Sequence, residues 1–251
     1  MKIYLYGTIP KQDAESWDPQ GLKADIDGER AEVELLVHQG VGFLYSRVDL
    51  GGKLKATRKN VQAHSETLGE LLDLTSTLAP VSFGAIVDDL KAVKKISSEN
   101  KEILEDTLEK INHKVEYGVK TYWDPDVVAR EIGETDRKVQ KLKKKVQKGK
   151  VGDQYQATVE VGELIDDKIE TKKEELRNTM LEYLTPVSDE WTSNEIFDER
   201  MAANLAFLLD RSSQDDFDKA MDSLGKSQPG YLTFKFSGPW PPFNFVDLEL
   251  R

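Results

Sequence analysis

The 251 residues of this chain allow one large domain or two of ordinary size. Hydrophobic residues make up 38% and charged residues 32%, and the formal net charge of −11 argues against general nucleic-acid binding. The absence of cysteine excludes disulfides and cysteine-ligated metals. No apolar stretch approaches the roughly 18 residues that span a bilayer, so we expect no membrane association and a cytoplasmic location.

The amino-terminal part of the chain predicts strands followed by helices. Alternating apolar and polar residues indicate strands, and apolar residues spaced by three and four indicate helices. The Gln39-Gly40 pair between two alternating stretches predicts a hairpin turn, and Ser97 and Ser98 are expected to cap a second helix start. The predicted elements are a strand at 1–6, a loop at 11–30, strands at 31–38 and 41–48, a helix from about 57 to 74, and helical segments up to 111.

The carboxyl-terminal half predicts an antiparallel sheet with helices packed on one face. Asp124-Pro125 is a typical helix start, with an N-cap aspartate and proline at the first helical position. The predicted elements are a strand at 115–123, helices over 125–184 interrupted at 149–152, a short helix capped at 192–195, a strand at 204–209, a helix at 213–225 and a strand at 230–236.

This order predicts an α+β fold with two domains, the second ferredoxin-like with an inserted set of helices. Such a sheet requires a fourth strand, which the pattern does not place. The predicted boundaries are an amino-terminal α+β domain at 1–112 and a ferredoxin-like domain at 113–242.

Patterns that indicate catalysis or metal binding are scarce. The three histidines lie far apart in sequence, and His64 falls on the apolar face of its predicted helix, as a hydrogen-bonded core histidine would. Gly225-Lys226-Ser227 ends like a phosphate-binding loop but follows a helix and precedes a strand, the reverse of the required order. We therefore expect no catalytic residue, cofactor or metal site. An enzyme acting through scattered acidic pairs, such as Asp88 and Asp89, remains the alternative.

Basic residues gather in one stretch of the predicted helical insert. Residues 138–150 contain seven lysines and no acidic residue. One reading is a docking surface for an acidic partner or a weak nucleic-acid contact, formed by Lys141, Lys144, Lys145 and Lys148. The other is a solvated helix that is balanced by acidic residues elsewhere.

The last predicted strand runs into a segment rich in proline and aromatic residues. Gly238 permits unusual backbone conformations, and Pro239, Pro241 and Pro242 lack N–H donors, so the ladder of the sheet is expected to stop here. The stiff segment would hold Trp240 in a fixed direction. Its indole is expected either to fill a gap in a core or domain interface or to contact a partner directly.

Several segments, in the same order along the chain, resemble those of the gas vesicle protein F and L family. The longest matches the family ending G-P-W-P-P, aromatic, x-F-V. Tyr117 stands where the family usually has Trp, Ser82 where it has Arg, and Ala85 where it has Thr. The matching segments are Tyr4-Leu5-Tyr6-Gly7, the helix around His64, Val81-Ser82-Phe83-Gly84-Ala85, Glu116-Tyr117-Gly118-Val119-Lys120, Asn204-Leu205-Ala206-Phe207-Leu208, and Gly238-Pro239-Trp240-Pro241-Pro242-Phe243-Asn244-Phe245-Val246.

The resemblance implies a non-enzymatic accessory protein of gas vesicles. It would bind the hydrophobic shell protein and other vesicle proteins and assist or nucleate assembly; the alternative is a stable minor component of the wall on its gas-facing side. The family has two α+β domains and a tail, here 243–251, that packs at their junction. The residues expected at this junction or against a partner are Pro239, Trp240, Pro241, Pro242, Phe243, Phe245 and Val246. The oligomeric state stays open.

Overall fold

The computed structural model describes residues 1–17, 21–50, 54–148 and 151–248, with the side chains of Lys148 and 151–153 also outside the description. It divides into two compact units. The first comprises Met1–Tyr117, Leu208–Arg211 and Gly238–Arg251, and the second comprises Gly118–Phe207 and Ser212–Ser237. The predicted mixture of helix and sheet is confirmed. The predicted boundary after residue 112 stays a prediction.

The first unit is built on a sheet whose strands are ordered β2-β3-β4-β1-β5, with β6 also paired to β1. Strands β1 and β4 pair antiparallel, with an irregularity between Leu5 and Gly7. The elements are β1 (Lys2–Pro10), α1 (Lys11–Glu15), β2 (Lys23–Ile26), β3 (Glu29–His38), β4 (Val41–Val48), α2 (Arg58–Leu74), β5 (Ala79–Pro80), β6 (Ile86–Val87), α3 (Leu90–Glu99) and α4 (Lys101–Lys110).

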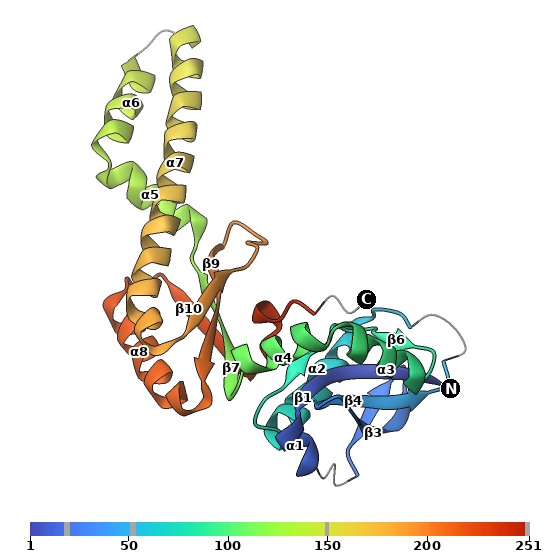
Figure 1. Ribbon diagram of the computed structural model, residues 1–251. Coiled ribbons are helices and arrows are strands. Elements are labelled where there is room, and N and C mark those ends of the chain that lie inside the picture. The colour runs from blue at the N-terminus through green and yellow to red at the C-terminus, as the bar shows by residue number, and fades with distance from the viewer. Residues whose placement is uncertain (18–20, 51–53, 149–150, 249–251) are drawn as a thin grey trace. The chain divides into compact units, whose positions relative to one another are not determined.

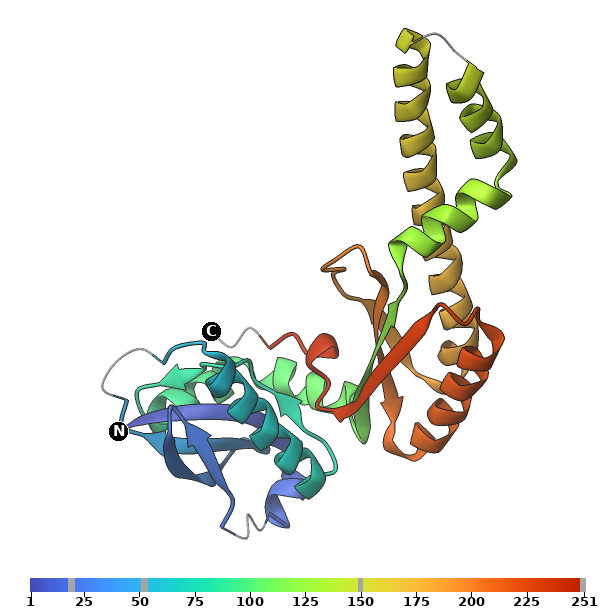
Figure 2. The same cartoon turned by 180° about the vertical axis from the view of Figure 1, so that it is seen from behind.

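Helices cover both faces of this sheet (Figures 1 and 2). Alternate residues of a strand point to opposite faces. Tyr4 meets α2 through a hydrogen bond to His64, whereas Ile3 and Leu5 belong to the cluster that includes Val93 of α3. Because both faces of the sheet are covered, β1 is buried along nearly its whole length rather than at every second residue.

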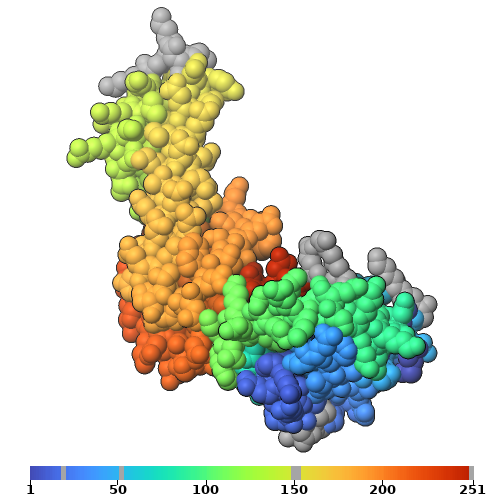
Figure 3. Space-filling model, in the orientation of Figure 1, coloured from blue at the N-terminus to red at the C-terminus, as the bar shows by residue number. Residues whose placement is uncertain are grey.

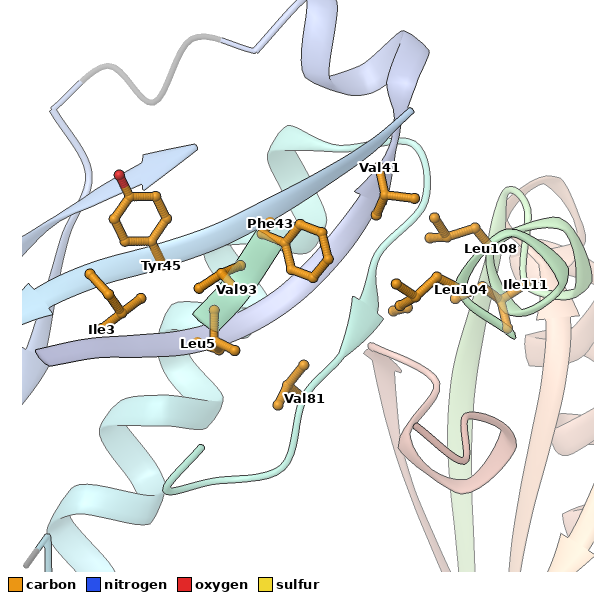
Figure 4. Packing of buried hydrophobic residues seen from close by; sticks show 11 residues of the cluster. Ile3, Leu5, Val41, Phe43, Tyr45, Val81, Val93, Leu104, Leu108 and Ile111 are labelled. Carbon is orange, nitrogen blue, oxygen red and sulfur yellow. The ribbon is translucent and has the colours of Figure 1, made fainter. Parts of the chain in front are cut away.

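The core on the α3 and α4 side brings together residues distant in sequence (Figure 4). Strands β1 and β4 supply one wall and the two helices the other. This arrangement explains the apolar spacing of three and four along α4, where Leu104 and Leu108 face the sheet. The cluster consists of Ile3, Leu5, Val41, Phe43, Tyr45, Ala79, Val81, Val93, Leu104, Leu108 and Ile111.

The predicted loop at 11–30 is wrong. Residues Lys11–Glu15 form α1, and Lys23–Ile26 form β2, which pairs with β3 across an Asp27-Gly28 turn with both φ angles positive. The Gln39-Gly40 turn is confirmed, since His38 pairs with Val41. The break between α3 and α4 falls at Asn100, not at the predicted serines.

The second sheet has the strand order β10-β7-β9-β8. Its central strand β9 is buried along almost its whole length, as its apolar run predicts. Phe207 of β9 packs against Phe217 of α8 with ring centroids 5.6 Å apart. The elements are β7 (Lys114–Tyr122), α5 (Pro125–Thr135), α6 (Arg137–Lys148), α7 (Val151–Leu184), η1 (Thr185–Val187), β8 (Glu190–Ser193), β9 (Met201–Asp210), η2 (Arg211–Ser213), α8 (Gln214–Ser227), β10 (Thr233–Trp240) and η3 (Phe243–Phe245).

A helical insert, α5 to α7, lies between β7 and β8. Asp124 caps α5 as predicted, accepting from the N–H groups of Asp126 and Val127. A second cap, Asp136, starts α6, so the insert contains three described helices, in agreement with the prediction of at least two. Helices α6 and α7 run side by side and project from the sheet of their unit (Figures 1 and 3).

Two further predictions for this half are wrong. The short helix expected to start at a cap over 192–195 does not form among the described residues, because Glu190–Ser193 form β8, the fourth strand that the sequence did not place. Strand β10 continues through Gly238 and Pro239 to Trp240, although proline lacks an N–H donor. Proline is compatible with β10 because it is an edge strand of this sheet.

Among the described residues, no helix combines the length and the apolar character needed to cross a bilayer.

Candidate interaction site

The end of β10 approaches β7 closely at Gly238, which precedes a cis peptide bond to Pro239. Its φ of +150° lies in a region that side-chain-bearing residues rarely adopt. A Cβ at this position would lie 2.8 Å from the backbone oxygen of Glu116 and 2.9 Å from the Tyr117 ring. Glycine is therefore required for this contact, which fixes where the following segment starts.

A buried carboxylate holds the next turn of the segment. Glu116 of β7 is 6% exposed and accepts two hydrogen bonds from Asn244, one from the backbone N–H at 2.8 Å and one from the side-chain amide. Burial raises the pKa of the Glu116 carboxyl, and the two Asn244 donors counter part of that rise. Two convergent donors thus partly compensate the cost of burying this acid.

Apolar residues and one cation attach the rest of the described tail to the first unit. Phe245 is 7% exposed, and its carbonyl accepts a hydrogen bond of 3.4 Å from the Lys110 ammonium. Val246 and Leu248 pack against the core cluster of Figure 4. The prediction that 243–251 pack at a domain junction stays a prediction, and residues 249–251 lie outside the described part.

The predicted aromatic residues separate into exposed and buried ones. Trp240 and Phe243 are 43% and 39% exposed, whereas Phe245 is buried. Pro241 and Pro242 are buried and Pro239 is exposed, while Val246 is half-buried. The segment therefore combines a buried anchor with two aromatic side chains that retain accessible surface.

A second set of exposed apolar residues was not predicted from sequence. It lies on β8 and in the loop that leads to β9, where Trp191, Ile196 and Phe197 are 39%, 41% and 70% exposed. Strand β8 is also an edge of its sheet. The misassigned short helix concealed this patch, although two aromatics among acidic and polar residues were a visible signal. We call these three residues the β8 patch.

His64 is a structural residue, as predicted. Its Nε2–H donates to the carbonyl of Val81 at 3.1 Å, so Nδ1 accepts from the Tyr4 hydroxyl at 2.8 Å. Burial lowers the pKa of His64 and raises that of Tyr4 to about 12. Both ring nitrogens are occupied, which leaves neither for acid–base chemistry.

Asp88 and Asp89, the acidic pair named above as a catalytic alternative, each contact a neighbouring group. Asp89 caps α3, and Asp88 lies 3.7 Å from the Lys2 ammonium. Within the described ranges, no three histidine, aspartate or glutamate side chains converge as they would around a metal ion.

The predicted basic surface lies on α6. Lys141, Lys144 and Lys145 are exposed, and none forms an ion pair with the described residues. The side chain of Lys148 lies outside the described residues. Cross-helix ion pairs occur at the base of the insert instead, between Lys168 and Asp136 at 3.2 Å and between Lys172 and Glu131 at 3.1 Å.

The sequence matches the family model described as gas vesicle synthesis protein GvpL/GvpF over residues 2–247. It is 25% identical over 252 residues to gas vesicle protein F1 of Halobacterium salinarum, covering 99% of this chain and 94% of that one. It is 24% identical over 249 residues to gas vesicle protein F of Nostoc sp., covering 98% of each.

Solved structures share this fold. The crystal structure of the gas vesicle protein GvpF from Anabaena sp. PCC7120 matches with a TM-score of 0.82 at 22% identity, covering 98% of both chains. That of GvpF from Microcystis aeruginosa matches with a TM-score of 0.80, also at 22% identity, covering 98% of this chain and 99% of that one.

Proposed function

Because the chain belongs to the gas vesicle synthesis protein GvpL/GvpF family, we propose that it is a non-enzymatic accessory protein of gas vesicles. In this proposal it binds the hydrophobic shell protein, together with other vesicle proteins, and assists or nucleates assembly of the shell. Its place of action is the gas vesicle.

The observation that carries this proposal is the exposure of the β8 patch. Large apolar side chains that gather on a charged protein surface typically mark a site for a partner. Phe197 is 70% exposed in the loop that follows β8, and Trp191 is 39% exposed on β8 itself, which is an edge strand. An edge strand offers unpaired backbone groups to an extended segment, and neighbouring aromatic side chains provide apolar contact.

The proposed partner fits this chemistry. A protein that lines a gas space carries an apolar face, and such a face aggregates in water until it is covered. The β8 patch would cover part of that face before or during polymerisation. The 32% content of charged residues keeps the rest of the chain compatible with water.

Co-expression with the shell protein tests the proposal. The tagged chain is expected to capture shell protein in a pull-down, and the double variant W191S/F197S to capture at least about tenfold less, as loss of aromatic anchors predicts. Tyr155→Ser is the matched control, since it removes a 77% exposed aromatic from α7 and should leave capture unchanged. Both variants should fold, because exposed substitutions change stability by about 0.5 kcal/mol or less.

Two results separate the proposed role from the proposed site. If the unaltered chain captures neither shell protein nor any other vesicle protein, the accessory role is wrong. If W191S/F197S captures as much as the unaltered chain, the role stands and the β8 patch is not the site.

A stable component of the gas-facing wall is the second candidate. Its difficulty is physical, because charged side chains facing gas would lose their solvation. Washing isolated vesicles with concentrated denaturant distinguishes the two roles. An assembly factor is removed by the wash, whereas a wall component stays with the shell.

We also infer that the second sheet and its helices form the ferredoxin-like arrangement expected from the sequence. The strand order β10-β7-β9-β8 supports this inference, since it places the first and third strands of the unit at the centre and the fourth and second at the edges. The insert α5 to α7 then replaces the first crossover helix.

A further inference from the structure

Helix α6 presents a surface of one charge. Residues 137–148 contain one arginine and six lysines without a single acid. Val139 is buried, and Leu142 and Val146 are half-buried, so the apolar side of the helix is already in use. Charged residues cover the remaining surface, where Lys141, Lys144 and Lys145 are exposed.

The same lysines form no ion pair with the acidic residues that the structure describes. Most described ion pairs of this protein join exposed lysines to acids on the same helix or a neighbouring element, as Lys168 pairs with Asp136 at the base of the insert. No acidic side chain among the described residues lies within 4 Å of the three α6 lysines. Like charges at spacings of three and four repel one another, so a binding partner of opposite charge would stabilise this helix.

Two classes of anionic partner fit poorly. A membrane surface binds amphipathic helices through an apolar face, and the apolar side of α6 is packed in its own unit. A nucleic acid would be repelled by the rest of a chain whose net charge is −11. An acidic protein surface remains, and this acidic chain supplies one itself.

Helix α4 carries a complementary surface in the first unit. Its exposed side bears Glu102, Glu105 and Asp106, at the same spacing of zero, three and four as the α6 lysines. Glu109 extends this row by another turn. The one described ion pair along it joins Glu105 to Lys101 at 3.7 Å, a solvent-exposed pair of the kind that contributes little.

The α4 surface also has features that favour a protein partner over solvent. Ile103 is 53% exposed beside the acids. A groove of about 450 Å³ adjoins α4 and is lined by Glu105, Glu109, Leu108 and Val41 together with the start of α1. Long lysine side chains can lay their methylene stems on an exposed apolar side chain such as Ile103 while keeping the ammonium near a carboxylate.

We propose that α6 of one copy binds along α4 of a second copy, with Lys141, Lys144 and Lys145 facing Glu102, Glu105 and Asp106. The two surfaces differ, so the contact is heterologous and leaves one free α6 and one free α4. A heterologous contact that does not close into a ring continues as a chain of copies. This self-association does not depend on the binding of other vesicle proteins.

Analytical ultracentrifugation of the purified full chain tests the proposal. At an ionic strength of about 10 mM, where screening extends over about 30 Å, the average mass should rise with concentration above the 28.4 kDa monomer. At about 1 M salt the screening length falls to about 3 Å, and the protein should be monomeric.

Charge reversal identifies the surfaces. The triple variants K141E/K144E/K145E and E102K/E105K/D106K should each raise the dissociation constant at least about tenfold. An equimolar mixture of the two variants should associate again, because each offers the other a complementary pair of helices. Circular dichroism verifies that both variants keep the helical content of the parent chain.

The matched control is K91E/K94E/K95E on α3, which has the same spacing of exposed lysines and the same change in net charge. It should leave self-association within about twofold of the parent. The proposal is wrong if the parent stays monomeric at low salt, if the α3 control weakens association as much as the α6 variant, or if the mixture fails to associate.

Discussion

The sheet of the first unit and the α6 helix of the insert differ in what holds them in place. Strand β1 is buried over seven consecutive residues, and β4 over all but one of its positions. On α6 only Val139 is buried among the described side chains, and lysines cover most of the rest. Because apolar burial is the main source of stability, the sheet contributes most to the stability of the fold. The exposed lysine surface of α6 contributes little to it and is available for recognition.

The largest expected effect tests this contrast directly. Leu44→Ala in β4 empties a fully buried site and should lower the free energy of unfolding by about 2–5 kcal/mol. Leu142→Ala on α6, a half-buried site, should cost about 1 kcal/mol or less. Urea unfolding of both variants measures the difference. Equal losses would show that the insert contributes as much packing as the sheet.

A glycine substitution tests the packing of the carboxyl-terminal segment in the same way. Gly238→Ala places a methyl group 2.8 Å from the Glu116 backbone oxygen and should cost about 1–3 kcal/mol. Gly118→Ala is the control, because its Cβ would meet no atom closer than the Ser237 hydroxyl at 3.7 Å. Thermal melting of the two variants should differ clearly, and similar melting would contradict the close approach.

The next largest effect is expected at the start of α6 in the helical insert. Asp136 accepts hydrogen bonds from the N–H groups of Lys138 and Val139 and also pairs with Lys168. Asp136→Ala should speed hydrogen exchange at the start of α6 without changing exchange in β1 and β4, because the cap is lost locally. Asp136→Asn keeps a capping oxygen and loses only the ion pair. Asp136→Asn should therefore retain most of the hydrogen-exchange protection at the start of α6. If Asp136→Ala and Asp136→Asn lose protection equally, the ion pair with Lys168 stabilises this helix start, and the cap does not.

The smallest effect is a pH dependence. Because the pKa of Glu116 is raised in the folded state, its contribution to stability is fully present below its ordinary pKa and is lost as the pH rises through the raised value. Glu116→Gln should therefore flatten the change in urea midpoint from about pH 5 to pH 7, relative to the parent. Asn244→Ala removes the side-chain amide, one of the two donors that lower this pKa, so it should steepen the same change. An unchanged slope in both variants would mean that the carboxyl is not buried in solution.

Local sequence patterns predicted the structure correctly at positions where an interaction between adjacent residues decides it. The Asp124-Pro125 helix start and the Gln39-Gly40 hairpin turn are confirmed, because each depends on the chemistry of adjacent residues. Asp27-Gly28 carries the same turn signal and was overlooked, since the polar residues around it favoured a loop. Strand β2 before this turn is only four residues long, and pairing with β3 stabilises it more than its own composition does.

Long-range pairing decided the rest. Strand β8 is four residues long and polar except for Trp191, and it forms because β9 offers it a partner edge. The residues at 192–195 have a local preference for a helix start, but the pairing of β8 with β9 outweighs that preference. The β8 patch became visible only once β8 was placed as a strand.

The sequence by itself determined the family, the mixture of helices and strands, the basic stretch on α6 and the core role of His64. These follow from residue order, from periodicity and from charge, all of which are local properties of the chain. Only the tertiary structure decided that Glu116 is a buried acid held by Asn244, 128 positions away in sequence. The alternating pattern of β7 does not show which acid will be covered, because burial depends on the segment that returns to pack against it.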